Sequence, residues 1–222
     1  MALPDLSTTA IAHYLTRGER IADRWVHVVG LVCGIGGGVL LVGMAIAAGG
    51  IGRVSAVTIY AACLIAMLAC SAAYNLAQGA KLQRRLRRFD HAAIFLLIAG
   101  SYTPFTTQRF EGVLAVAMTL AVWAIALVAA AGKLFLPGIA KKLWLPVYLL
   151  LGWMVVGAIG PLIDGVRPAA VILLAVGGVI YSVGVLIYIW QKLPYRRAIW
   201  HGFVVAAAGA HYAAVMTGVV LA

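Results

Sequence analysis

Five polar residues at helix-like spacing are the part of this sequence whose types could do chemistry. Ser71 and Asn75 stand four residues apart, and so do Arg197 and His201. Residues four apart lie on the same face of an α-helix, so each pair can point at one site. With Asp90, they bring together a hydroxyl, an amide, a guanidinium, an imidazole and a carboxylate. Such groups hydrogen-bond a polar ligand, and the imidazole and the carboxylate also bind metal ions.

The composition of the chain indicates which elements must position these residues. The chain has 222 residues, of which 64% are hydrophobic and 10% are charged. Soluble domains carry about 45–50% apolar and about 25% charged residues, so this chain is too apolar to fold in water. The same values exclude a disordered chain, and three cysteines argue against a disulfide scaffold. We therefore expect a membrane protein, in which polar residues within the spans face the interior.

Seven apolar runs are candidates for membrane-spanning helices, each of which needs about 20 residues. The runs cover residues 26–48, 54–77, 91–107, 113–132, 143–163, 169–190 and 198–222. The third is the weakest, because Gly100, Ser101 and Pro104 interrupt it, and a kinked helix packed inside the bundle explains this. The sequence predicts an all-α fold with an N-terminal segment at 1–25 and a seven-helix transmembrane domain at 26–222.

The basic residues predict how this bundle is oriented, because cytoplasmic loops carry an excess of Lys and Arg. With the N-terminus inside, the four inside segments hold three, five, three and three basic residues, which is 14 of the 17. We therefore expect the N-terminus in the cytoplasm and the C-terminus outside. The densest basic stretch, at 81–88, is expected to lie against anionic lipid headgroups. A nucleic-acid partner is not expected, because no nucleic-acid-binding fold accompanies the charge.

In this orientation the five polar residues reach the same depth. Ser71 and Asn75 lie near the cytoplasmic end of the second run, Asp90 adjoins the third, and Arg197 and His201 begin the last. We predict that they surround one interior site near the cytoplasmic face. The alternative is that they are headgroup-level polar residues of the kind found at any helix end, but their convergence from several helices weighs against it.

Three glycines at intervals of four form a stripe on the first run. Gly30, Gly34 and Gly38 share one helix face, which is the pattern of close helix approach in membranes. Packing inside the bundle is the expected use of this stripe, and a homodimer interface is the alternative.

Several segments of the chain resemble the hemolysin III branch of the PAQR (progestin and adipoQ receptor) family. They are SAAYN at 71–75, FDHAAIFLLIAGSYTPF at 89–105, LGW at 151–153 and PYRRAIWHGFV at 194–204, followed by HY at 211–212. Glu19 and His27 also fit the N-terminal pattern of the family. The resemblance covers nearly the whole chain, and it implies a seven-helix protein of the cell membrane.

The resemblance further implies a buried zinc ion near the cytoplasmic face. In the family, a serine four residues before a histidine on the second span, an aspartate at the start of the third and two histidines on the last make this site. Three histidines hold zinc and the aspartate orients a bound water, which is the composition of a catalytic zinc site. Members of the wider superfamily are thought to hydrolyse lipid amides.

This sequence departs from that pattern at two of the three zinc ligands. Asn75 and Arg197 stand at histidine positions, and His201 is the single retained ligand. An amide oxygen is a poor zinc ligand, and a guanidinium has no lone pair to offer. A three-histidine zinc site cannot form from these positions, which argues against a bound cofactor and against an enzyme without deciding either. Zinc binding would need His27 or His91 as a substitute ligand, although nothing in the spacing asks for that. Ser71 and Asp90 would be catalytic only in an active form.

Three functions are compatible with these residues. The first is a hemolysin III-like protein with a degenerate metal site that acts in membrane homeostasis or lipid sensing, with membrane lipids as partners. The second is a zinc-dependent lipid-amide hydrolase, similar to a ceramidase, with an altered metal site. The third is a pore or transporter, as the cytolytic name of the family suggests, but the spans contain no rings of like charge.

The replacement of a ligand by arginine suggests how the site is held without zinc. Arg197 lies one turn before His201, so we predict that its guanidinium takes the place of the metal and pairs with the Asp90 carboxylate. In the alternative, Arg197 extends into the cytoplasm.

Overall fold

The structure is a computed structural model that describes residues 14–136 and 141–222, without the side chains of 141–143. The described residues form helices and contain no β-strand. The helices are α1 Arg17–Ala48, α2 Ile51–Leu76, α3 Ala80–Gln108, α4 Gly112–Phe135, α5 Lys141–Gly152, α6 Ile159–Gly165, α7 Pro168–Ile189 and α8 Arg196–Val215. Two short segments complete the list, a 3₁₀ turn at Met154–Ala158 and a π turn at Met216–Val220.

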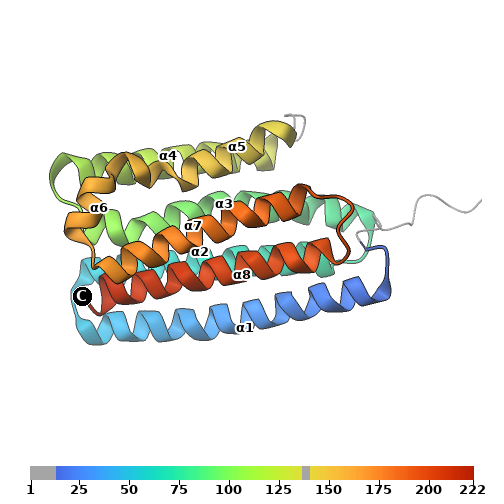
Figure 1. Cartoon of the computed structure of the whole chain (residues 1–222), viewed down its shortest axis with the longest axis horizontal. Helices are drawn as coiled ribbons and strands as arrows, with labels where there is room; N and C mark the ends of the chain where they lie inside the picture. Colours follow the sequence, from blue (N-terminus) through green and yellow to red (C-terminus); the bar gives the residue numbers. More distant parts are fainter. Residues whose placement is uncertain (1–13, 137–140) are drawn as a thin grey trace, which may run out of the picture.

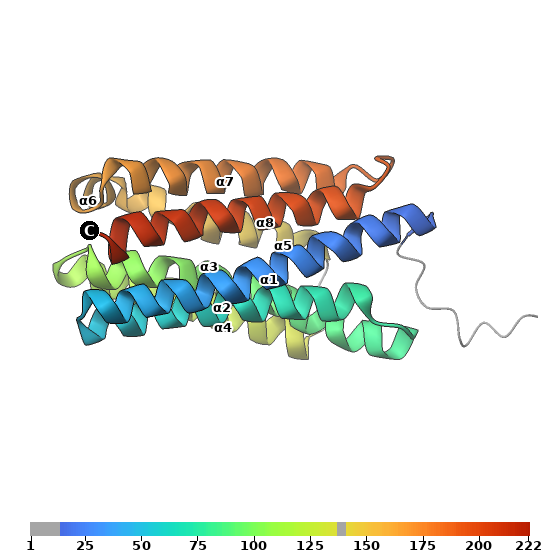
Figure 2. The same ribbon diagram turned by 90° about the horizontal axis from the view of Figure 1, so that it is seen from below.

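The long helices run side by side along the long axis of the molecule as an up-and-down bundle (Figures 1 and 2). Along the chain, α1 packs against α2, α2 against α3, and α3 against α4. The last helix, α8, packs against both α7 and α1, so the end of the chain returns to its beginning. In Figure 1, α1 lies along one side of the bundle and α4 and α5 along the other. This topology brings the start of α1 and the start of α8 together.

Six segments of the described chain are long and apolar enough to cross a membrane. They are Arg17–Ala48, Ile51–Leu76, Gly112–Phe135, Trp144–Gly165, Pro168–Ile189 and Arg196–Val220. The third predicted span lies in α3, which is not among the six; it packs between α2 and α4 and buries much of its length. A buried helix can carry polar residues, and Thr103 and Thr107 donate hydrogen bonds to carbonyl groups one turn earlier. The count of seven spans and the orientation stay predictions.

The first predicted span needs correction, and the fifth contains an irregular segment. The first helix begins at Arg17, nine residues before the predicted start at 26, so part of the polar N-terminal segment is helical. The fifth span, predicted over 143–163, is found as one candidate span at Trp144–Gly165, but a 3₁₀ turn interrupts its helix between α5 and α6. Pro161 explains part of this interruption, because it has no N–H to donate to a carbonyl one turn before it.

Tyr102 of α3 satisfies the backbone groups that this interruption leaves free. Its hydroxyl oxygen lies 3.0 Å from the carbonyl of Leu151 and 2.9 Å from that of Gly152, and it accepts a hydrogen bond from the N–H of Val155 at 2.9 Å. A membrane interior offers no water to do this, so non-helical backbone persists there only where protein groups pair with it. The Tyr102 hydroxyl therefore holds the break in place.

The glycine stripe on α1 packs inside the bundle, as predicted. Gly30, Gly34 and Gly38 are all buried. A Cβ atom added at Gly30 would lie 2.8 Å from Val205 of α8, and one added at Gly34 would overlap Leu68 of α2. The stripe thus lets α1 approach both neighbours closely.

Candidate functional site

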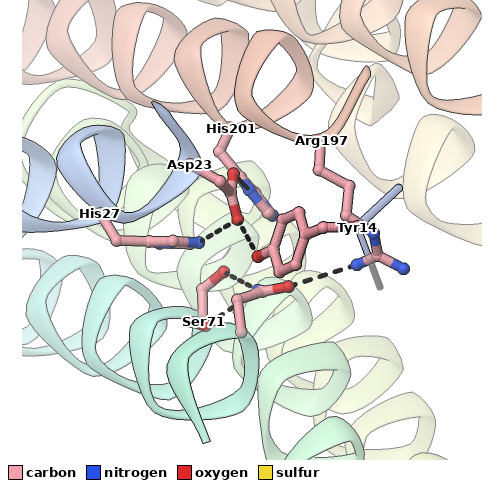
Figure 3. Close-up of polar contacts among 7 residues, drawn as sticks. Tyr14, Asp23, His27, Ser71, Arg197 and His201 are labelled. Atoms are coloured by element: carbon pink, nitrogen blue, oxygen red, sulfur yellow. Dashed lines mark hydrogen bonds and ion pairs between the residues drawn. The ribbon is translucent and has the colours of Figure 1, made fainter. Parts of the chain in front are cut away.

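Asp23 of α1 is the centre of a buried polar cluster (Figure 3). Its side chain is fully buried. Oδ1 lies 2.6 Å from Nδ1 of His201, and Oδ2 lies 3.5 Å from Nε2 of His27. The Tyr14 hydroxyl donates a hydrogen bond to Oδ2 at 2.5 Å. We refer to Asp23, His27 and His201 as the Asp–His–His cluster.

The N-terminus of α1 holds this cluster against α8. The Thr16 hydroxyl accepts a hydrogen bond from the N–H of Glu19, which caps α1, and the Glu19 carboxylate accepts one from the N–H of Leu15, just before the cap. The other Glu19 oxygen accepts a hydrogen bond from the N–H of Tyr195, at the start of α8. Asp23 lies one turn further along α1, where it meets His201.

Ser71, Asn75 and Arg197 form a second group beside this cluster. The Asn75 amide donates to the Ser71 carbonyl at 2.9 Å and to the Ser71 hydroxyl at 3.5 Å. Arg197 Nη1 donates to the Asn75 amide oxygen at 3.3 Å. Asp90 is buried nearby, with the Ser71 hydroxyl as a hydrogen-bond partner and His27 and Arg197 among the groups that act on it electrostatically.

The predicted ion pair between Arg197 and Asp90 is wrong. Among the described residues, the ion pairs join Asp23 to His27 and to His201, and neither Arg197 nor Asp90 takes part in one. Arg197 is instead half-buried, with its guanidinium on Asn75 and 5.9 Å from the centre of the Tyr14 ring. Arg197 therefore acts on Asp90 at longer range than an ion pair.

Asp23 is the site residue that the sequence reasoning missed. It lies before residue 26, in the predicted polar N-terminal segment and outside the first predicted span. A signal was present, because Asp23 and His27 are four residues apart and share one helix face, as the two predicted pairs do. The structure places His201 with this pair, facing Asp23, while Asn75 contacts both Ser71 and Arg197.

Tyr14 lies just before α1 and contacts the Asp–His–His cluster through Asp23. Burial and its hydrogen bond to Asp23 raise the pKa of Tyr14, so the hydroxyl keeps its proton and acts as a donor to the carboxylate. The ring of Tyr14 also separates the cluster from the guanidinium of Arg197 (Figure 3).

The residues at the histidine positions do not fit the zinc site that the resemblance implies. Asn75 and Arg197 bind each other through a hydrogen bond, and a guanidinium cannot ligate a metal ion. The donors that do suit a metal are those of the Asp–His–His cluster. Within the described residues, these three buried side chains each present one ligand atom, all within 4.8 Å of one another.

Comparison with known proteins places the chain among membrane proteins of one family. The model of a family described as haemolysin-III related matches residues 19–212. A hemolysin-3 homolog of Bacillus subtilis (strain 168) is 33% identical over 198 residues, which cover 89% of this chain and 93% of the relative. Hemolysin-3 of Bacillus cereus is 31% identical over 186 residues, or 84% of this chain and 85% of the relative.

A more distant relative comes from animals. The monocyte to macrophage differentiation factor of Homo sapiens is 31% identical over 130 residues, which cover 57% of this chain and 52% of the relative. The family match spans both the Asp–His–His cluster and the Ser71, Asn75 and Arg197 group. The chain therefore belongs to the haemolysin III-related family and is a multi-pass integral membrane protein.

Proposed function

We propose that this protein senses membrane lipid without hydrolysing it, by binding an anionic headgroup at Arg197. The observation that carries the proposal is the contact between Arg197 and Asn75. These two residues stand at two of the three positions where the family's zinc ligands are expected, and they bind each other through one hydrogen bond. Where the wider superfamily is expected to have a hydrolytic zinc site, this protein has an arginine beside a group of polar residues.

The surroundings of Arg197 suit an anionic group. Nη1 is bound to Asn75, but Nε is buried without a hydrogen-bond partner. A buried donor of this kind gains from a charged acceptor, and guanidinium matches the geometry of phosphate oxygens. Arg196 and Arg197 also line a small cavity of about 60 Å³ between the start of α1 and the start of α8. The proposed ligand reaches Arg197 through this cavity.

The charge at this end of the bundle supports the same ligand. The first turns of α1, α3 and α8 all carry arginine or lysine, as does the last turn of α4. Each basic residue near a membrane surface attracts anionic lipid by about 1 kcal/mol. If the positive-inside prediction holds, the ligand is a lipid of the cytoplasmic leaflet.

Binding to lipid bilayers tests the proposal. Purified protein is reconstituted in nanodiscs that contain phosphatidylcholine, with or without phosphatidylglycerol, and bound lipid is counted by native mass spectrometry. We expect selective retention of phosphatidylglycerol, reduced in Arg197→Gln and unchanged in the control Arg53→Gln, which changes an arginine at the opposite end of the bundle. Equal retention by Arg197→Gln would overturn the proposal.

A lipid-amide hydrolase is the second candidate, and the Asp–His–His cluster is the observation that favours it. Two imidazoles and a carboxylate are a ligand set found in catalytic zinc sites. Ceramide turnover by the purified protein, abolished in Ser71→Ala and Asp90→Asn, would establish this function and remove the first. Release of a trapped dye from liposomes would instead indicate a pore.

A further inference from the structure

We propose that Asp23, His27 and His201 bind a divalent transition-metal ion, with Zn²⁺ as the representative, that joins the first helix to the last. This site lies outside the three-histidine set that the family resemblance implies, since it keeps only His201 and takes its other two ligands from α1. It also goes beyond lipid sensing at Arg197, because none of its ligands contacts the proposed headgroup.

The geometry of the cluster is close to that of a metal site. Zinc bonds of about 2.0–2.2 Å place tetrahedral ligand atoms about 3–3.5 Å apart. Asp23 Oδ1 lies 2.6 Å from His201 Nδ1, and Asp23 Oδ2 lies 3.5 Å from His27 Nε2. All three ligand atoms lie within 4.8 Å of one another. Small side-chain rotations are therefore enough to bring them onto one ion.

A second observation indicates that His27 lacks a hydrogen bond within the cluster. His27 is 6% exposed, and its Nε2 is buried without a hydrogen bond. This nitrogen points at the Asp23 carboxylate, into the space shared with His201 (Figure 3). His27 Nε2 has the Asp23 carboxylate 3.5 Å away but no hydrogen bond. Because a buried nitrogen without a hydrogen bond is unfavourable, a metal bond at His27 Nε2 would satisfy this group.

The donor chemistry selects the class of ion. Two imidazole nitrogens and one carboxylate oxygen suit zinc, iron(II) or cobalt(II), whereas calcium and magnesium prefer oxygen ligands alone. The Tyr14 hydroxyl, which donates to Asp23 Oδ2, would hold the carboxylate in its binding orientation. Asp23 and the nearby Asp90 would offset the charge of the ion inside an apolar bundle.

The placement of the ligands indicates what the ion would do. Asp23 and His27 lie on α1 and His201 lies on α8, 178 residues after Asp23 in the chain. An ion held by all three therefore fastens the two ends of the bundle together. The site is a clamp between helices, placed beside Ser71 and Asn75 but separate from them.

Metal content and stability of the full-length protein test this site. Purified protein is stripped with chelator, dialysed against Zn²⁺ or Co²⁺, and measured by elemental analysis and thermal unfolding. We expect about one ion per chain and a higher melting temperature with metal. His27→Gln and His201→Gln should weaken binding more than tenfold. The control His211→Gln, which changes a histidine further along α8 whose Nδ1 is bonded to Ala207, should bind as the parent does.

The outcomes separate this site from the alternatives. Protein that takes up no metal, or that keeps its affinity in His27→Gln, would overturn the proposal and leave a hydrogen-bonded network in its place. If the variants fail to fold, X-ray absorption of the zinc-loaded parent decides, since we expect nitrogen and oxygen neighbours with two imidazole rings. Spectra with sulfur or a single imidazole would refute it. Lipid retention measured on chelated protein tests Arg197 independently of this result.

Discussion

Arg197 makes a different contact from the one that its place in the sequence suggests. An arginine beside a buried aspartate suggests an ion pair, but the guanidinium bonds to the neutral Asn75 amide, and Ser71 partners Asp90. The difference changes the expected loss of stability. Removing one member of a buried ion pair leaves the other charge without compensation, which typically destabilises a protein by about 3–5 kcal/mol. Removing a donor from an amide leaves only a neutral group.

We therefore expect Arg197→Ala to lower the free energy of unfolding by about 1 kcal/mol, the usual contribution of one hydrogen bond. Chemical denaturation of the purified protein in detergent measures this change, with Arg84→Ala, which changes an exposed arginine of α3, as the control. A loss of about 3–5 kcal/mol that Asp90→Asn partly restores would show that the ion pair forms after all.

At the scale of elements, the interruption of the fifth span shows how one side chain stabilises irregular backbone in the membrane. α5 and α6 are joined by a 3₁₀ turn, and the Tyr102 hydroxyl of α3 pairs with backbone groups at the end of α5 and within the turn. Tyr102 belongs to the segment that carries the family resemblance most specifically, at 89–105. Its hydroxyl has an evident structural role there.

Tyr102→Phe should therefore destabilise the protein by about 1–3 kcal/mol, because it leaves buried backbone groups unsatisfied. The melting temperature in detergent measures the effect. Tyr188→Phe is a matched control, since Tyr188 is 45% exposed, and it should change stability little. Equal effects of the two substitutions would contradict the role assigned to Tyr102.

At the scale of the whole molecule, the distribution of basic residues and the alternating helices predict one orientation in the membrane. The first turns of α1, α3 and α8 lie at the same end of the bundle and carry basic residues. A positively charged end stays in the cytoplasm. In an odd number of crossings, the two termini lie on opposite sides.

A reporter fused after Ala222 should consequently be active only outside the cytoplasm. A reporter fused after Gln191, between α7 and α8, should be active only inside, and it serves as the matched control. Alkaline phosphatase and green fluorescent protein fusions measure the two compartments. Cytoplasmic activity of the fusion after Ala222 would refute the orientation, the count of seven spans, or both.

The sequence by itself determined the features that depend on local pattern. Long apolar runs predict membrane helices. A spacing of four places Gly30 and Gly34 on one face of the first helix, and Ser71 and Asn75 on one face of the second. These features follow from helix periodicity alone, so they need no knowledge of neighbouring helices. The predicted packing of the glycines inside the bundle is confirmed.

Only the tertiary structure decided which polar groups meet. Asp23 and His201 are 178 residues apart, and Arg197 selects Asn75 rather than Asp90. Such choices depend on the rotation and depth of each helix relative to its neighbours. One residue turns a helix by about 100° and raises it by about 1.5 Å, so a small offset changes which side chain faces which. Helix packing across the whole bundle sets that offset, and no local pattern encodes it.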